Sequence, residues 1–358
     1  MGEFAGWEMP ISYPLGTLEE HKACRNGVAV FDVSHLGTVR VRGAGAFAVL
    51  QRTFTNDLGK IRPGKAQYTH LLDRADGSVQ DDVIVWWVED DWFDVMPNAS
   101  NTQGVLGALS EEARSVGVSL DVADVTDQRA VIAVQGPAVD EVLGRVLENL
   151  GSRERFGVVR CRWEAEEVIV AGTGYTGEEG VELAVPVTAA CSLWSRLLAN
   201  GSVPAGLAAR DTLRLEMGFP LHGHELGPGI TPLQAGLGWV VAWSKGDFRG
   251  RAALEEEMRK GPTRRLVGLL GRSRRPLRDG CAVLYGSRRV GVSTSGSFSP
   301  CLERGIGLAL VEADVPDGAE VEVDVRGRAE GATIVRPPFV RPGAGCPPGS
   351  SGSGAAGP

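Results

Sequence analysis

Two adjacent aspartates, Asp81 and Asp82, precede the apolar run VIVWW and could take part in acid–base chemistry. Successive side chains on a strand point to opposite faces, so the pair is not expected to share a proton. Asp82 would lie on the same face as Ile84 and Trp86, and a carboxylate beside a large aromatic ring suits a planar heterocyclic ligand. The alternative is that both acids end a turn and are solvated.

A glycine-rich segment, GTGYTG at residues 172 to 177, matches the dinucleotide fingerprint Gly-x-Gly-x-x-Gly. A dinucleotide site would also need a helix that begins at the last glycine and an acid about 20 residues further on. The following residues, EEGVELAV, alternate with the period of a strand, and no Asp or Glu occurs from Ala184 to Arg210. The sequence therefore predicts a β-hairpin with Tyr175 at its tip and Glu182 on its second strand, and it disfavours NAD binding.

The remaining polar residues are weaker candidates for a functional site. Arg210, in the expected helix PAGLAARDTLRLEMG, could bind a ligand carboxylate through two parallel hydrogen bonds or pair with a nearby acid. His222, His224 and Glu225 form H-x-H-E, but no further ligand is spaced to complete a metal site. The six cysteines are scattered without a C-x-x-C pair and indicate reduced packing residues, not zinc ligands. We therefore expect no metal.

The elements that must position these groups alternate irregularly between strand and helix over the first 250 residues, which favours an α+β fold. A helix is expected over 17–27, with Thr17 and Glu20 as a capping box. Paired strands are expected over 82–89 and 92–97. Further helices are expected over 44–54, 101–116, 138–150, 189–200 and 251–260.

The pattern of secondary-structure signals in the sequence changes near Gly261. Short β-like runs punctuated by Gly, Pro and Asp predict a small antiparallel barrel over residues 262–340. The last segment, residues 341–358, is rich in Gly, Pro and Ser and is expected to be disordered.

Composition limits the possible partners. The chain of 358 residues has a net charge of −8, which argues against a nucleic-acid partner. No apolar run approaches the roughly 18 residues of a membrane span, and the start lacks the basic and apolar regions of a signal peptide. We therefore expect a cytoplasmic protein with no membrane partner.

Several stretches, in order along the chain, together resemble the aminomethyltransferase, or T-protein, of the glycine cleavage system. They include FDVSHLG (31–37), TNDLGKIRPGKAQYT (55–69), DDVIV (81–85), GYTGEEGVEL (174–183) and KGDFRGRAAL (245–254). The resemblance covers nearly the whole chain up to Phe339. It implies a cloverleaf of three domains around a central folate site, with residues 1–250 as a folate-binding region of two α+β subdomains and the barrel as the third domain.

The resemblance also implies a reaction. The aminomethyl group on the dihydrolipoyl arm of the glycine cleavage H-protein would give its one-carbon unit to tetrahydrofolate, with release of ammonia and formation of 5,10-methylenetetrahydrofolate. Tetrahydrofolate would be a co-substrate, and the lipoylated H-protein the macromolecular partner.

Site residues follow from the same resemblance, position by position. Asp82 matches the catalytic carboxylate, and Glu182 matches the glutamate that binds the pterin. Tyr68 and Tyr175 match aromatic residues of the pocket, and Arg210 matches the arginine of the folate site. Ile84 and Trp86 are expected to line the same pocket because they share the face of Asp82.

Two activities on related scaffolds remain alternatives. A folate-binding iron–sulfur assembly factor carries a cysteine in K-G-C-[YF]-x-G, whereas Asp247 stands at that place in KGDFRG. A folate-dependent demethylase acting on a sulfonium or N-methyl compound is not excluded by the sequence. A binding protein with a degenerate site is disfavoured by the presence of Asp82, Glu182 and Arg210.

Overall fold

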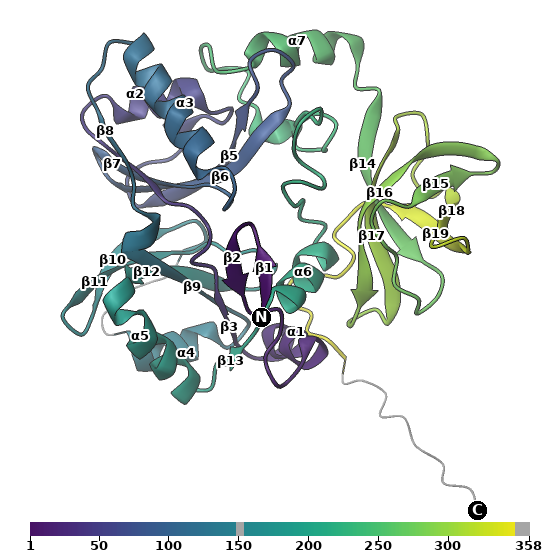
Figure 1. Ribbon diagram of the computed structural model, residues 1–358, viewed down its shortest axis with the longest axis horizontal. Helices are drawn as coiled ribbons and strands as arrows, with labels where there is room; N and C mark the ends of the chain where they lie inside the picture. Colours follow the sequence, from purple (N-terminus) through teal and green to yellow (C-terminus); the bar gives the residue numbers. More distant parts are fainter. Residues whose placement is uncertain (148–153, 348–358) are drawn as a thin grey trace, which may run out of the picture.

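The computed structural model describes residues 1–147 and 154–347, arranged as two sheets with their helices and a separate barrel (Figure 1). The chain opens with a small hairpin, β1 (Gly2–Phe4) and β2 (Trp7–Met9), followed by helix α1 (Thr17–Asn26). None of the helices in the described ranges is long and apolar enough to cross a membrane.

The first sheet has six strands, all antiparallel except for the pairing of β13 with β3. Its two faces differ because side chains alternate along each strand. One face packs against helices α4 (Val139–Val146) and α5 (Val187–Ala199), and the other faces the second sheet. In spatial order the strands are β10 (Val158–Trp163), β11 (Glu166–Ala171), β12 (Gly180–Pro186), β9 (Arg129–Gln135), β3 (Ala29–Asp32) and β13 (Val203–Pro204).

The second sheet has five antiparallel strands, and helices α2 (Ala46–Thr53) and α3 (Thr102–Ser115) cover one face of it. In spatial order the strands are β5 (Lys65–Leu72), β6 (Val79–Glu89), β7 (Trp92–Met96), β4 (Val39–Arg42) and β8 (Asp121–Asp124). Between the two sheets lies a shared core, to which helix α6 (Leu207–Glu216) adds Ala209 and Leu213.

The third unit is a closed antiparallel barrel of six strands, joined to the rest through α6 and helix α7 (Arg251–Lys260) (Figure 1). Leu215 of α6 packs against Ile306 and Leu308 of the barrel. In order around the barrel the strands are β14 (Arg264–Gly271), β17 (Arg304–Glu312), β16 (Arg288–Ser299), β15 (Ala282–Tyr285), β18 (Glu320–Asp324) and β19 (Ala329–Val335). The predicted α+β fold with a C-terminal antiparallel barrel is confirmed.

Short 3-10 helices complete the described chain: η1 (Leu58–Lys60), η2 (Thr126–Gln128) and η3 (Gly238–Val240). The helix predicted over 138–150 is observed as α4, and residues 148–150 of that prediction lie outside the described residues.

The predicted capping box is wrong. Gly16, not Thr17, is the N-cap of α1, and no side chain caps the helix. Glu20 does not bond back to the start of its own helix, because its carboxylate accepts hydrogen bonds from the backbone N–H groups of Tyr13 and Gly206. A buried carboxylate that joins two distant segments therefore replaces the local cap.

The predicted disordered tail is wrong for its first part. Cys346 is buried, and its backbone N–H donates to Oδ1 of Asn26 at 2.7 Å while Nδ2 of Asn26 donates to its carbonyl at 3.1 Å. One asparagine side chain thus satisfies both backbone groups of Cys346, which holds this segment against α1. Residues 348–358 of the predicted tail lie outside the described residues.

Candidate functional site

The glycine-rich segment joins β11 to β12 in the predicted antiparallel hairpin, in which Ala171 pairs with Glu182. Its glycines make room for the buried side chain of Gln135. A Cβ on Gly174 would lie 1.9 Å from Oε1 of Gln135, and one on Gly180 would lie 2.2 Å from its Nε2. The segment therefore wraps around a glutamine, and a strand follows it where a dinucleotide site needs a helix.

Hydrogen bonds from Gln135 fix the shape of this loop. Its Nε2 donates to the carbonyls of Thr173 at 3.1 Å and Val181 at 3.2 Å, and its Oε1 accepts from the hydroxyl of Thr176 at 2.9 Å. Tyr175 lies between these anchored residues, so its position is set by buried contacts on both sides.

Asp82 lies on β6 with its carboxylate held by two donors. The hydroxyl of Tyr68, on the neighbouring strand β5, donates to Oδ2 at 3.0 Å, and Nδ2 of Asn98 donates to Oδ1 at 2.9 Å. Burial raises the pKa of Asp82 above its ordinary value, although these two hydrogen bonds act in the opposite direction. The half-buried carboxylate is therefore oriented, and it is a stronger base than a free aspartate.

Tyr68 connects Asp82 to a buried histidine. Because the Tyr68 hydroxyl donates to Asp82, Nε2 of His70, at 3.1 Å, must donate to the Tyr68 oxygen. Burial lowers the pKa of His70 to about 3, so the ring is neutral, and its Nδ1 has no hydrogen-bond partner among the residues described. The three side chains form one directed chain of hydrogen bonds that ends on Asp82.

Asp81 has a different role. It is fully buried, and its carboxylate accepts from Nδ2 of Asn98 at 2.7 Å and from Nδ2 of Asn101 at 2.9 Å. Burial, together with the charge of Asp82, raises the pKa of Asp81. Nδ2 of Asn98 donates to both carboxylates, and the backbone N–H of Asp82 also donates to Oδ1 of Asp81 at 3.1 Å. Asp81 therefore positions the asparagine that orients Asp82.

A second cluster brings together Tyr175, Arg210 and Phe219. The guanidinium of Arg210 lies 4.8 Å from the centre of the Tyr175 ring, which stacks on Phe219 at 5.8 Å. Burial raises the pKa of Tyr175, and the charge of Asp82 adds to the rise, so the two clusters lie within electrostatic reach of each other.

The guanidinium of Arg210 makes no ion pair or hydrogen bond with any residue in the described ranges, so the local salt bridge considered from the sequence is not observed. Burial lowers its pKa, and the charge of Glu182 opposes this. A half-buried guanidinium without a fixed anion is suited to binding an anionic ligand.

Glu182, on β12, is only 7% exposed and accepts a short hydrogen bond from the hydroxyl of Thr173 through Oε2. Its face of the sheet is the one that borders the shared core between the sheets. The carboxylate is thus turned toward the β6 side of the molecule and keeps acceptor capacity on both oxygens.

Ile84 and Trp86 follow Asp82 on the same face of β6, but they differ in exposure. Ile84 is half-buried against the core between the sheets, whereas Trp86 is completely buried in it. Trp86 also lines a pocket of 180 Å³ whose lining includes Arg129 but not Asp82. The structure therefore places Trp86 in the core, and its role in a pocket with Asp82 stays a prediction.

Comparisons with known proteins agree with this architecture. The family model described as the GCVT N-terminal domain matches residues 1–245, and that of the glycine cleavage T-protein C-terminal barrel domain matches residues 264–341. The chain belongs to the glycine cleavage T-protein family. The predicted aminomethyltransferase identity is confirmed at this level.

Named relatives of this T-protein family are similar over nearly the whole chain. The aminomethyltransferase of Mycobacterium tuberculosis (strain ATCC 25618 / H37Rv) is 49% identical over 344 residues, covering 94% of this chain and 92% of that one. The one from Parafrankia sp. is 46% identical, with 94% and 93% covered. The crystal structure of glycine cleavage system aminomethyltransferase T from Bartonella henselae superposes with a TM-score of 0.88 at 34% identity, covering 95% and 94% of the two chains.

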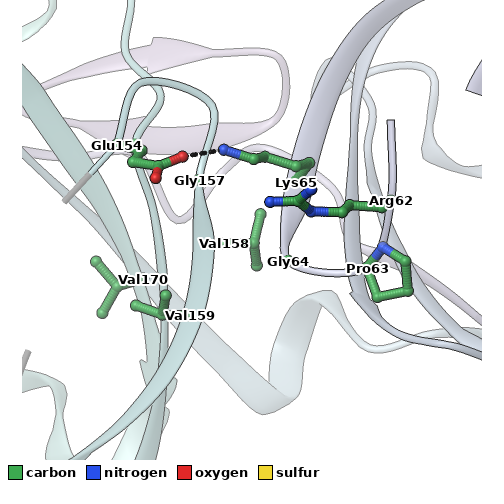
Figure 2. A pocket seen from close by; sticks show the side chains of 10 residues that line it. Arg62, Pro63, Gly64, Lys65, Glu154, Gly157, Val158, Val159 and Val170 are labelled. Atoms are coloured by element: carbon green, nitrogen blue, oxygen red, sulfur yellow. Dashed lines mark hydrogen bonds and ion pairs between the residues drawn. The ribbon is translucent and has the colours of Figure 1, made fainter. Parts of the chain in front are cut away.

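A separate pocket of 240 Å³ lies where the start of β5 meets the start of β10 (Figure 2). Arg62 and Lys65 stand on one wall, Lys65 forms an ion pair with Glu154, and Val159 and Val170 lie opposite. None of the site residues predicted for a T-protein lines this pocket.

The sequence did not indicate the role of Asn98, Asn101 and His222, which form a polar network with the two aspartates. Asn101 contacts the ring of His222 at 3.3 Å, and Nε2 of His222 lies 2.9 Å from the carbonyl of Gln80. The two asparagines in PNASN, directly after a predicted strand, were the available signal. The histidine that looked like part of a metal motif instead belongs to this polar network.

Proposed function

We propose that the protein transfers the one-carbon unit of an aminomethyl group from the dihydrolipoyl arm of the H-protein to tetrahydrofolate, releasing ammonia and forming 5,10-methylenetetrahydrofolate. The observation that carries the proposal is the half-buried carboxylate of Asp82, oriented by Tyr68 and Asn98 and within electrostatic reach of Tyr175. Family membership supports the reaction, and Asp82 would supply the base for it.

The chemistry breaks the carbon–sulfur and carbon–nitrogen bonds of the –S–CH2–NH2 group. Two new bonds join its carbon to N5 and N10 of the folate, and the two hydrogens that leave these nitrogens end on the thiol and on ammonia. Asp82 would accept a hydrogen bond from the attacking folate N–H, orient the nitrogen and take up its proton. Burial of Asp82 favours this role because it makes the carboxylate more basic.

Glu182 and two residues of the second cluster, Tyr175 and Arg210, would bind the folate. Glu182 can accept two parallel N–H bonds from the amino-pyrimidine edge of the pterin, and the hydroxyl of Thr173 holds its carboxylate in place. Arg210 would bind an anionic group of the folate, and Tyr175 would contact the planar ring. This chemistry requires no metal.

The decisive experiment is tetrahydrofolate-dependent release of ammonia from aminomethylated lipoyl H-protein, measured for wild type and for Asp82→Asn. The amide keeps the shape but cannot take the proton, so turnover should be abolished while tetrahydrofolate binding is largely kept. Asp90→Asn is the matched control, because Asp90 is exposed at the end of the same strand pair and should leave the rate unchanged.

Each negative result of this experiment would reject a different part of the proposal. No turnover by wild type that still binds tetrahydrofolate would reject the H-protein reaction and favour the demethylase or the assembly factor. Full activity of Asp82→Asn would reject the assigned base. The H-protein partner, the absence of a nucleic-acid or membrane partner and the cytoplasmic location stay predictions.

A further inference from the structure

A histidine and two cysteines from three distant parts of the chain meet at one point. His21 comes from α1, Cys301 from the turn after β16, and Cys346 from the C-terminal segment, and their metal-ligating atoms all lie within 4.8 Å of one another. His21 is fully buried and Cys346 is 5% exposed.

The tautomer of His21 is set by its surroundings. The hydroxyl of Thr212 donates to the carbonyl of Ala209 at 2.9 Å, so it accepts from Nδ1 of His21 at 2.8 Å. With the hydrogen on Nδ1, Nε2 points at Sγ of Cys301, 3.6 Å away, and at Oε2 of Glu216, 3.2 Å away. A cation between Nε2 and the carboxylate, either a proton or a metal ion, makes this contact favourable. A histidine that binds a metal through Nε2 typically donates its Nδ1–H in this way.

The separation of the ligand atoms of His21 and Cys301 fits one ion. With zinc–sulfur and zinc–nitrogen bonds of about 2.3 Å and about 2.0 Å, tetrahedral angles place the two ligand atoms about 3.5 Å apart. The observed separation of Nε2 of His21 and Sγ of Cys301 is 3.6 Å. Thiolate and imidazole ligands together are typical of zinc.

Both cysteines are also held through their backbones. Cys346 is bonded on both sides by Asn26, and the backbone N–H of Cys301 donates to Oε1 of Glu216 at 3.2 Å. Because these bonds do not involve the sulfur atoms, the thiols are positioned before any ligand arrives.

We propose that His21, Cys301 and Cys346 bind one zinc ion with a structural role. The fourth position faces Oε2 of Glu216 or takes a water molecule. Each thiol gives up its proton on binding, any proton on Nε2 of His21 leaves as well, and the two thiolates neutralise the charge of the metal. The charge of Glu216 is already balanced by Arg25 at 2.9 Å. The ion would fasten the barrel and the C-terminal segment to α1, which revises the expectation that these cysteines only pack.

The test uses the full chain, reduced and stripped with a chelator. Zinc is titrated in competition with a chromophoric chelator for wild type, Cys301→Ser, Cys346→Ser and the control Cys191→Ser, whose cysteine is exposed on α5. Wild type and Cys191→Ser should bind one ion per chain. Loss of either cysteine ligand should weaken binding more than about tenfold, and Cys346→His should restore part of it because histidine is also a zinc ligand.

Cobalt provides a readout that does not depend on the variants. Cobalt bound by wild type should show the charge-transfer absorption of thiolate ligands, and zinc should remove it. Thermal unfolding of the metal-free variants checks that each one folds. Equal zinc affinity of wild type and Cys346→Ser, no thiolate absorption with cobalt, or a disulfide between Cys301 and Cys346 in place of the metal would each overturn the proposal.

Discussion

Replacing Tyr68 by phenylalanine removes one oxygen atom that bonds to both Asp82 and His70. Hydrogen bonds to charged groups contribute about 1.5–3 kcal/mol, so the loss at Asp82 should lower kcat by about 10-fold to about 150-fold at neutral pH. The buried Nε2–H of His70 would also lose its acceptor, which should lower the free energy of unfolding by about 1–3 kcal/mol.

The pH dependence gives the sharper test. The Tyr68 hydroxyl stabilises the ionised form of Asp82 and therefore lowers its pKa, so Tyr68→Phe must raise that pKa. A base works only when it is ionised, and the acid limb of the kcat profile should move to higher pH. The loss of activity should accordingly be greatest at low pH and shrink as the pH rises.

The assay is ammonia release from aminomethylated H-protein across the pH range, with urea unfolding of the same samples. Tyr285→Phe is the control, because Tyr285 is 40% exposed on the barrel and should change neither quantity. An acid limb that stays in place, with activity lost equally at every pH, would refute the claim that Tyr68 tunes Asp82. It would show instead that the hydroxyl contacts the substrate directly.

Three further outcomes are expected. Glu182→Gln should weaken tetrahydrofolate binding about tenfold or more, because an amide presents one acceptor oxygen to paired donors; equal affinity by calorimetry would remove the pterin assignment. Burial alone would raise the pKa of Glu216, but hydrogen bonds and charges from its partners lower it to about 2 from the ordinary 4.5. The stabilisation that ionised Glu216 gives the folded protein is therefore complete above pH 4.5 and is lost toward pH 2. The difference in unfolding free energy between metal-free wild type and Glu216→Gln, measured by urea unfolding, should shrink by about 3 kcal/mol over that window. Gly174→Ala should cost about 1–3 kcal/mol of unfolding free energy by pushing into Gln135, whereas Gly144→Ala, with nothing within 4 Å, should not destabilise; equal stability of the two variants would contradict the packing argument.

The sequence was sufficient where the signal was local. The strand after Gly177 followed from the alternation of Val181 and Leu183 with Glu182, and the structure confirms it as β12. The barrel followed from short strands separated by turn residues. In both cases the period of the side chains decides which face is buried, and that period can be read without knowing the tertiary contacts.

The site was predictable only in part, because its supporting contacts join residues far apart in the chain. Asn101 reaches His222 across 121 positions, and Glu20 bonds to Gly206 across 186. The position of Trp86 on the face of Asp82 was predicted correctly, but burial between the two sheets depends on the neighbouring sheet, which no local pattern specifies. Long-range polar contacts of this kind override local preferences such as the capping box.

The dependence of the glycine-rich loop on Gln135 has an evolutionary consequence. Gln135 leaves no room for a side chain at Gly174 or at Gly180, and the glutamine in turn needs the backbone of the loop for its own hydrogen bonds. No single substitution at these three positions leaves the other two unaffected. We expect these positions to change together among related proteins, with a smaller residue in place of Gln135 arising before alanine at Gly174. At Gly180 the carbonyl of Val134, 2.7 Å from an added Cβ, would still exclude alanine.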